Sequence, residues 1–259
     1  MNLAVAFDND SFSAQAEKLA VKLELPLVDL ALGYPKTGAW DYILLYQSGG
    51  LGLQALDEAT QGPVRVDFSS ARLRNRRRSG HNEILGRACG VKGAFQPSVI
   101  DATAGLGVDS FILADLGCKV TLIERSPIIM ALLEDGVMRA SLMEQGQVTD
   151  RMLLRSGDSA DYLTTLNAGD IDVVYLDPMF PERGKSAKAK KEMLAFQQLV
   201  GEGDNDNEDC LLDESRRVAK YRVVVKRPIK APYMASQKPA FDLRGKTIRY
   251  DVYTKLKLP

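Results

Sequence analysis

One stretch of this chain places an acidic residue, a glycine-containing loop and a helix start in the order of a small-molecule site. The apolar residues 99–100 are followed by Asp101, by a loop of small residues that contains Gly105 and Gly107, and by an apolar helix start at 111–113. A loop without bulky side chains lets backbone N–H groups and a helix N-terminus approach a ligand closely. The pattern is typical of a doubly wound α/β sheet, in which ligands bind at the carboxyl ends of strands.

The acidic residue at the end of the next predicted strand helps to identify the ligand. Residues 118–123 predict a strand that ends at Glu124, 23 residues after Asp101, and an acidic residue near this spacing can bind a ribose diol. A dinucleotide site favours a third glycine where this chain has Ser110, and the Asp109 carboxylate would oppose a pyrophosphate. S-adenosylmethionine suits this loop better, because it has a sulfonium, an amino group and no phosphate.

A second segment follows the buried strand predicted at 171–176 and consists of Asp177, Pro178, Met179 and Phe180. It is similar to the Asp/Asn-Pro-Pro-Tyr/Phe motif of methyltransferases that modify exocyclic or amide nitrogens. Such a nitrogen is a poor nucleophile, because its lone pair is shared with a π-system. The Asp177 carboxylate and the Pro178 carbonyl can accept its N–H groups and aim the lone pair, and Phe180 offers a face on which a base stacks.

The composition is that of an ordinary globular protein with room for a sizeable core. The chain has 259 residues, of which 45% are hydrophobic and 26% are charged, and its formal net charge is zero. Nucleic-acid binding would therefore require local patches of charge. Three scattered cysteines and a single histidine give no metal spacing, so we expect no metal site. Without a signal-peptide pattern or a long apolar run, we expect a cytoplasmic protein with no membrane association.

Hydrophobic spacing predicts two units, a small α/β subdomain at 1–62 and a Rossmann-like domain at 63–259. The first unit is expected to contain strands at 3–7, 26–30 and 41–46, a helix at 11–23 and a turn at 49–52. The second is expected to form a seven-stranded, mostly parallel sheet with an antiparallel last strand. Its recognisable strands are 99–101, 118–123, 151–155, 171–176, 221–228 and 247–253. Asp158 and Ser159 follow the third of these, where an adenine amino group would be read and a helix would be capped.

Clusters of basic residues offer local sites for an anion. Five arginines within seven residues lie near the start of the second unit, namely Arg72, Arg74, Arg76, Arg77 and Arg78. Four lysines follow the Pro-rich turn, and a basic pair ends the strand predicted at 221–228; these residues are Lys185, Lys188, Lys190, Lys191, Lys226 and Arg227. Because arginine binds phosphate bidentately and stacks on bases, we interpret these clusters as RNA-binding, with a solvated surface as the alternative.

With these residues identified, the chain resembles the ribosomal RNA small subunit methyltransferase J family, guanine-N2 methyltransferases of bacteria. The matching segments include the arginine-rich run and residues 66–68, 90–93, 101–107, 124–125, 174–181, 190–193 and 223–228. Met179 is part of that family's version of the motif. The resemblance implies a Rossmann-like class I S-adenosylmethionine-dependent methyltransferase that acts on the 2-amino group of one guanosine in 16S rRNA, with the rRNA or the small ribosomal subunit as its partner.

The resemblance also implies which residues contact the cofactor. They are Val108 and Asp109, Glu124 and Arg125, Asp158 and Ser159, and Asp177. The family commonly has arginine where this chain has Val108, so a contact there would use the backbone. From the loop pattern we add Asp101, Gly105 and Gly107, which are expected to seat the amino-acid end of the cofactor.

We expect catalysis mainly by positioning, with Asp177 and Pro178 orienting the guanine amino group and Phe180 stacking on the ring of a splayed-out nucleotide. No metal or covalent intermediate is required. Two other interpretations remain. The chain could methylate a protein amide or a DNA base, because the motif fits any planar nitrogen. It could also be a non-catalytic RNA-binding ribosome assembly factor, although such a protein need not keep the glycine loop, Glu124 and Asp177 together.

Replacing Arg76, Arg77 and Arg78 together with glutamine is expected to weaken RNA binding and to flatten its salt dependence. Each lost phosphate contact should reduce the slope of log affinity against log salt by about one. Fluorescence anisotropy with a 16S rRNA fragment measures this slope, and S-adenosylmethionine affinity serves as the control. Weaker cofactor binding with unchanged RNA binding would show that the arginines serve another purpose.

Overall fold

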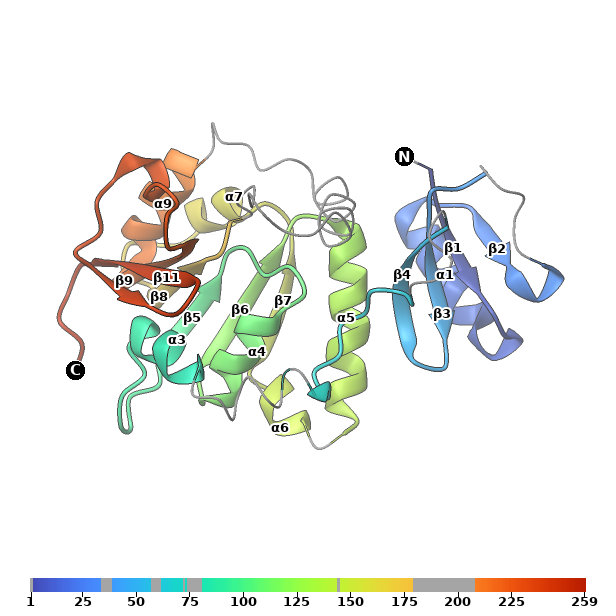
Figure 1. The fold of residues 1–259 in the computed structure, drawn as a ribbon, viewed down its shortest axis with the longest axis horizontal. Coiled ribbons are helices and arrows are strands. Elements are labelled where there is room, and N and C mark those ends of the chain that lie inside the picture. The colour runs from blue at the N-terminus through green and yellow to red at the C-terminus, as the bar shows by residue number, and fades with distance from the viewer. Residues whose placement is uncertain are drawn as a thin grey trace.

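The computed structural model describes residues 2–33, 39–56, 62–71, 73, 81–143, 145–178 and 208–259. Within them the chain forms two sheets that lie at opposite ends of the molecule (Figure 1). The first has four strands in the order β2-β1-β3-β4, and the second has seven in the order β10-β11-β9-β8-β5-β6-β7. Among the described helices, none combines the length and the apolar composition that crossing a bilayer requires.

The four-stranded sheet is built around β1 (Leu3–Phe7), whose small and apolar residues are almost all buried. Strand β1 pairs in parallel with β2 (Leu27–Asp29) and β3 (Tyr42–Gln47), and helix α1 (Ser13–Leu23) packs against β1. These elements agree with the strands and the helix expected from the sequence. The turn predicted at 49–52 is wrong in part: Gly49 lies in the turn, but Gly50 already begins strand β4 (Gly50–Ala55), which pairs antiparallel with β3.

That error has a physical reason. Leu51 and Leu53 of β4 are buried, and Gly52 lies between them where an added Cβ would come within 2.7 Å of the Pro63 Cβ. The glycines that suggested a turn therefore serve two different purposes. Gly50 has a φ of 89° at the start of the strand, and Gly52 allows a close approach of neighbouring chain.

The seven-stranded sheet has the expected mostly parallel order. Strands β5 to β9 run parallel to one another, and β11, the last of the described strands along the chain, runs antiparallel to β9. Strand β10 pairs antiparallel with β11 and was not predicted. The bounds are β5 (Ser98–Asp101), β6 (Lys119–Glu124), β7 (Met152–Ser156), β8 (Ile171–Leu176), β9 (Ala219–Pro228), β10 (Phe241–Arg244) and β11 (Ile248–Thr254).

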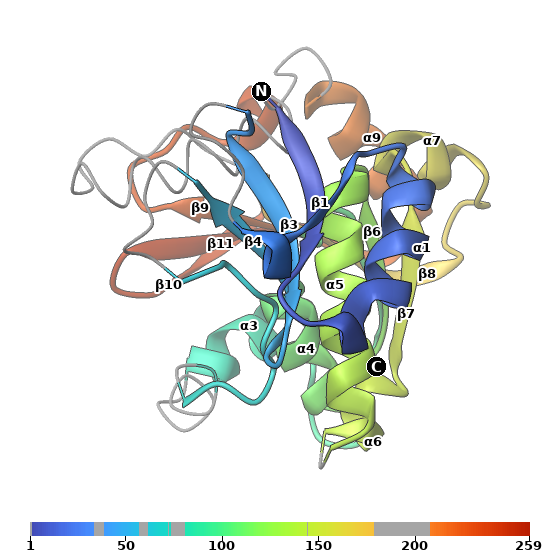
Figure 2. The same ribbon diagram turned by 90° about the vertical axis from the view of Figure 1, so that its right-hand side faces the viewer.

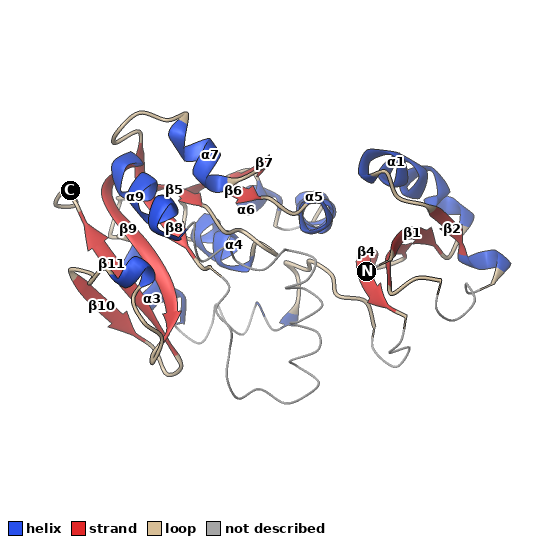
Figure 3. Ribbon diagram, turned by 90° about the horizontal axis from the view of Figure 1, so that it is seen from above, coloured by secondary structure: helices blue, strands red, loops and turns tan. Residues whose placement is uncertain are grey.

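Helices cover both faces of this sheet (Figure 3). Alternate residues of β8 accordingly belong to different hydrophobic clusters: Val173 and Tyr175 pack with α3, α4 and α5, whereas Val174 and Leu176 pack with α7 and α9. Two buried faces explain the nearly continuous apolar runs of the central strands. The helix bounds are α3 (His81–Cys89), α4 (Val108–Asp115), α5 (Pro127–Ser141), α6 (Gly146–Thr149), α7 (Ser159–Thr164) and α9 (Glu208–Val218).

Helix α5 joins the two sheets (Figure 2). The carboxylate of its Asp135 accepts a hydrogen bond from the backbone N–H of Leu51 at 3.1 Å and forms an ion pair with Arg139 at 2.7 Å. Arg139 also donates to the carbonyl oxygen of Val66. One hydrophobic cluster contains buried side chains from both predicted units. The division of the chain at residue 62 therefore remains a prediction from the sequence, because the hydrophobic core continues from one predicted unit into the other.

Replacing Gly136 of α5 with alanine is expected to lower the free energy of unfolding by about 1–3 kcal/mol, although alanine ordinarily stabilises a helix relative to glycine. An added Cβ would lie 2.3 Å from Cγ1 of Val66 and 3.1 Å from its backbone oxygen. Chemical denaturation measures the effect. Gly62→Ala is the control, because no atom lies within 4 Å of its added Cβ. A Gly136→Ala protein as stable as the wild type would contradict this close packing.

Candidate active site

The carboxyl ends of adjacent parallel strands bring the predicted cofactor residues to one edge of the large sheet. Asp101 ends β5 and pairs with Leu122 of β6 and Tyr175 of β8, and Glu124 ends β6 opposite Ser156 of β7. Residues far apart in the sequence thus become neighbours because the strands that carry them are neighbours. This edge is where a doubly wound sheet binds its ligand.

The loop after β5 is organised around the Asp101 carboxylate, which is 2% exposed. It accepts a hydrogen bond from the Thr103 backbone N–H at 3.1 Å and another from the Ser110 hydroxyl at 2.5 Å. Burial raises the pKa of Asp101 to about 7, against the effect of these two hydrogen bonds, and the charges of Asp109 and Asp177 add to the increase. Asp101 therefore holds the loop from both of its ends.

The two glycines of the loop have different surroundings. Gly105 and Gly107 both adopt positive φ, of 52° and 71°. A Cβ added at Gly105 would meet only the Thr103 carbonyl oxygen, at 4.0 Å, so space beside the loop is open there. A Cβ at Gly107 would lie 2.7 Å from the Leu133 side chain, so this glycine is required by the core packing beneath α4. Val108 is the first residue of α4 and is 39% exposed.

Glu124 connects the loop to the neighbouring strand. Its carboxylate accepts hydrogen bonds from the backbone N–H groups of Gly105 at 3.0 Å and Ser126 at 2.7 Å. The side chain is buried, and burial raises the pKa of Glu124 despite these hydrogen bonds and the charge of the exposed Arg125. The carboxylate predicted to bind a ribose is thus held at the loop by backbone donors.

The segment after β7 is a helix cap, as expected. Asp158 is the N-cap of α7 and accepts hydrogen bonds from the backbone N–H groups of Ala160 at 2.8 Å and Asp161 at 3.2 Å. The Ser159 hydroxyl donates to the Ala102 carbonyl oxygen at 2.5 Å, which ties α7 to the loop after β5. Contact of these residues with an adenine remains a prediction.

Asp177 lies directly beside the loop. Its backbone N–H donates to the Thr103 hydroxyl at 2.6 Å, and its carboxylate accepts from the Lys226 ammonium at 2.6 Å. The same ammonium lies 2.7 Å from the Asp109 carboxylate, which also accepts from the buried Tyr175 hydroxyl at 2.7 Å. Sequence reasoning missed Tyr175 and gave Lys226 to an RNA surface. The position of Lys226 at the carboxyl end of a buried strand was the signal that could have placed it in the site.

The structure buries Arg227, for which the sequence predicted an RNA contact. Its side chain is 2% exposed, and its guanidinium pairs with the Glu208 carboxylate at 2.9 and 3.0 Å. Alternation along β9 turns Arg227 away from the side chain of Lys226 and towards α9. Other predicted site residues lie outside the described residues: Met179, Phe180, Arg72, Arg74, Arg76, Arg77, Arg78, Lys185, Lys188, Lys190 and Lys191.

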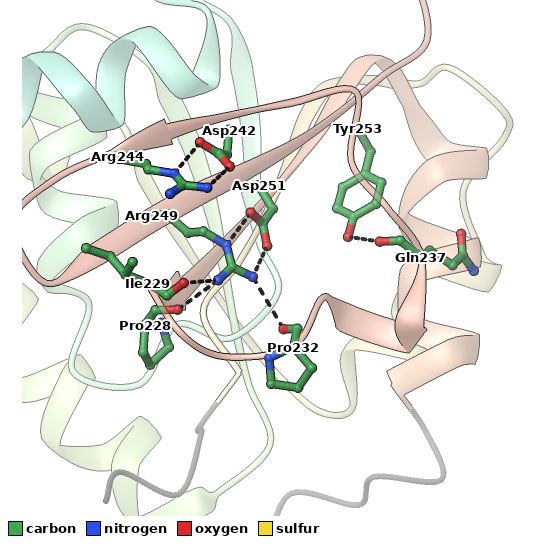
Figure 4. Close-up of polar contacts among 9 residues, drawn as sticks. All are labelled: Pro228, Ile229, Pro232, Gln237, Asp242, Arg244, Arg249, Asp251 and Tyr253. Carbon is green, nitrogen blue, oxygen red and sulfur yellow. Dashed lines mark hydrogen bonds and ion pairs between the residues drawn. The ribbon is translucent and has the colours of Figure 1, made fainter. Parts of the chain in front are cut away.

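A further buried arginine fixes the loop that follows β9 (Figure 4). Arg249 forms a bidentate ion pair with Asp251 at 2.7 and 3.0 Å, and both side chains are almost completely buried. The same guanidinium donates to the carbonyl oxygens of Pro228, Ile229 and Pro232. These contacts hold the backbone just beyond Lys226 in place.

Comparisons with known proteins agree with this arrangement. Residues 29–255 match the family described as "Putative SAM-dependent methyltransferase". Two proteins named Ribosomal RNA small subunit methyltransferase J, from Cellvibrio japonicus and Ectopseudomonas mendocina, are 43% and 46% identical to this chain; the alignments cover 97% and 88% of it and the same shares of the relatives. The crystal structure of a SAM-dependent methyltransferase from Neisseria gonorrhoeae is similar, with a TM-score of 0.73 and 36% identity, over 97% of this chain and 96% of that one.

Replacing Asp101 with asparagine is expected to change how stability depends on pH. In the folded protein Asp101 has a pKa of about 7, and in the unfolded chain about 4. Its contribution to the free energy of unfolding is thus complete below about pH 4 and is lost as the pH rises through about 7. Between about pH 5 and 8 the wild type should lose more stability than Asp101→Asn, as measured by denaturant unfolding. Parallel curves would contradict the raised pKa, and Asp150→Asn, at an exposed position, is the control.

Proposed function

The chain belongs to the ribosomal RNA small subunit methyltransferase J family, and on this premise we propose that it methylates the exocyclic N2 amine of a guanosine in 16S rRNA. The sheet is that of a Rossmann-like class I methyltransferase, and S-adenosylmethionine is the cofactor. The names of the relatives support the small-subunit rRNA substrate. The choice of guanine N2 rests on the sequence resemblance alone. Such an enzyme would work in the cytoplasm, where ribosomal subunits are assembled.

The position of Asp177 is the observation that supports methyl transfer to a planar nitrogen most directly. Its backbone is hydrogen-bonded to Thr103 of the loop after β5, so the proposed acceptor carboxylate is next to the proposed cofactor loop. Asp177 is half-buried and Pro178 follows it at the end of β8. A nitrogen held by Asp177 would therefore lie beside a ligand held by the loop.

The residues at this edge fit S-adenosylmethionine. When bound, it supplies a methyl group on a positively charged sulfur. The edge offers the Glu124 carboxylate for ribose hydroxyls and the Asp158 carboxylate for an adenine amino group. Added Cβ atoms at Gly105 and Gly157 would meet open space, which leaves room beside both loops.

The chain's own residues would act by orientation. The Asp177 carboxylate and the Pro178 carbonyl would accept hydrogen bonds from the N–H groups of the amine and direct its lone pair. Holding the nitrogen in line with the methyl group that it attacks would account for the rate of methyl transfer. Phe180 is proposed to stack on the base once the nucleotide is splayed out. We propose the arginine-rich and lysine-rich segments as the RNA surface and leave out Arg227, which is buried.

Replacing Asp177 with alanine is expected to lower the rate of methyl transfer by about 100-fold or more, because the amine loses its orienting acceptor. The assay uses labelled S-adenosylmethionine with small ribosomal subunits from cells that lack this protein, beside naked 16S rRNA and bulk protein. Nuclease digestion and mass spectrometry then locate the label. Circular dichroism checks the fold, and Asp150→Ala provides a matched control at an exposed position.

The outcomes of this assay separate the alternatives. N2-methylguanosine at one position in 16S rRNA supports the proposal, and the preferred substrate form would place the reaction in subunit assembly. Label in protein would instead favour an amide methyltransferase. Cofactor binding without any label would favour an assembly factor, and wild-type turnover in Asp177→Ala would overturn the role of Asp177.

A further inference from the structure

Lys226 occupies an unusual position for a surface-type residue. It lies near the carboxyl end of β9, next to the end of β8, and its side chain is 20% exposed. Its ammonium nitrogen is 2.6 Å from Oδ2 of Asp177 and 2.7 Å from Oδ2 of Asp109. One cation therefore bridges the proposed catalytic carboxylate and a carboxylate in the first turn of α4.

Among the described residues, the charged groups that act on Lys226 are the carboxylates of Asp109 and Asp177. Asp101 and Tyr175 interact electrostatically with these two carboxylates, and Tyr250 of β11 is the cross-strand partner of Lys226. Burial lowers the pKa of Lys226, but Asp109 and Asp177 together raise it above its usual value. The ammonium is therefore charged at neutral pH.

We propose that Lys226 is a positioning residue for methyl transfer, whose ammonium keeps the Asp177 carboxylate charged and fixed in the orientation that the acceptor amine requires. This inference rests on the proposed function, in which Asp177 accepts the N–H of the amine. A protonated Asp177 would carry an O–H donor on one oxygen and would be a weaker acceptor for the N–H of the amine, so it would direct the lone pair less well. Without Lys226, repulsion between Asp109 and Asp177 would favour uptake of a proton.

The surrounding contacts keep Lys226 in this place. The Tyr175 hydroxyl donates to the same oxygen of Asp109 that contacts Lys226, which fixes that carboxylate from the side of β8. The backbone of Asp177 is held independently by Thr103. Lys226 thus controls the side chain of Asp177, whereas the loop after β5 controls its main chain.

The test compares Lys226→Met with Lys226→Arg, which keeps the charge. Lys220→Met is the matched control, because Lys220 is an exposed lysine on the same strand that lies over the Tyr221 ring. Two readouts are used: ¹³C NMR titration of the aspartate carboxyl groups, assigned with Asp177→Asn, and kcat and KM against pH for methyl transfer to 16S rRNA.

In Lys226→Met we expect the Asp177 carboxyl to titrate about one pH unit or more above its wild-type position. Below that shifted titration kcat should fall by about tenfold for each unit of the shift and recover as the pH is raised above it, while KM for S-adenosylmethionine changes by less than about threefold. Lys226→Arg should keep the wild-type pH profile, as should Lys220→Met. Adding Asp109→Asn to Lys226→Met removes the neighbouring negative charge and should move the profile back. If Lys226→Met does not fold, Lys226→Gln replaces it and is expected to give the same shifted titration and profile.

Two results would overturn the proposal: an unchanged Asp177 titration in Lys226→Met, or a loss of rate that is equal at every pH. The second would indicate that Lys226 only supports the local structure. Absence of rRNA methylation by the wild type would instead overturn the proposed function. The carboxyl titration would then decide by itself whether Lys226 controls the charge of Asp177.

Discussion

Burial of carboxylates at one edge of a sheet is the constraint on which this site depends. A carboxyl group that leaves water needs a proton, a cation or hydrogen-bond donors. Asp101, with a pKa of about 7, meets the requirement largely through a proton below neutral pH. Asp109 and Asp177 meet it through the ammonium of Lys226. The order of strands makes this possible, because β9 lies next to β8 and brings its lysine to the end of that strand.

The loop after β5 shows how one short motif satisfies two demands at once. Gly105 leaves space where a ligand is expected, and its N–H is held by Glu124. Gly107 instead permits the close contact of α4 with Leu133 in the core. The site and the hydrophobic core thus begin within two residues of each other. A change at Gly107 would therefore affect stability first, whereas a change at Gly105 would affect the ligand space.

The strands of the large sheet could be predicted because two covered faces produce long apolar runs, as in β8 and β9. Strand β10 could not, since its residues Phe241–Arg244 are all partly or fully exposed. The grouping of Asp101, Glu124 and Asp177 followed from the rule that parallel strands share one carboxyl edge. The partners of Lys226 and Arg227 depend instead on strand order and register, which a local pattern does not encode.

The core shared between α5 and the four-stranded sheet has a consequence for synthesis of the chain. Leu51 is buried and bonded to Asp135, so the edge at β4 is completed only when α5 is present. Proteins are made from the amino terminus, and domains generally fold in that order. Here the four-stranded sheet is synthesised first, and its apolar surface against α5 is exposed to water as long as the nascent chain ends before residue 127. Its folding is completed only after the translating ribosome has passed Ser141.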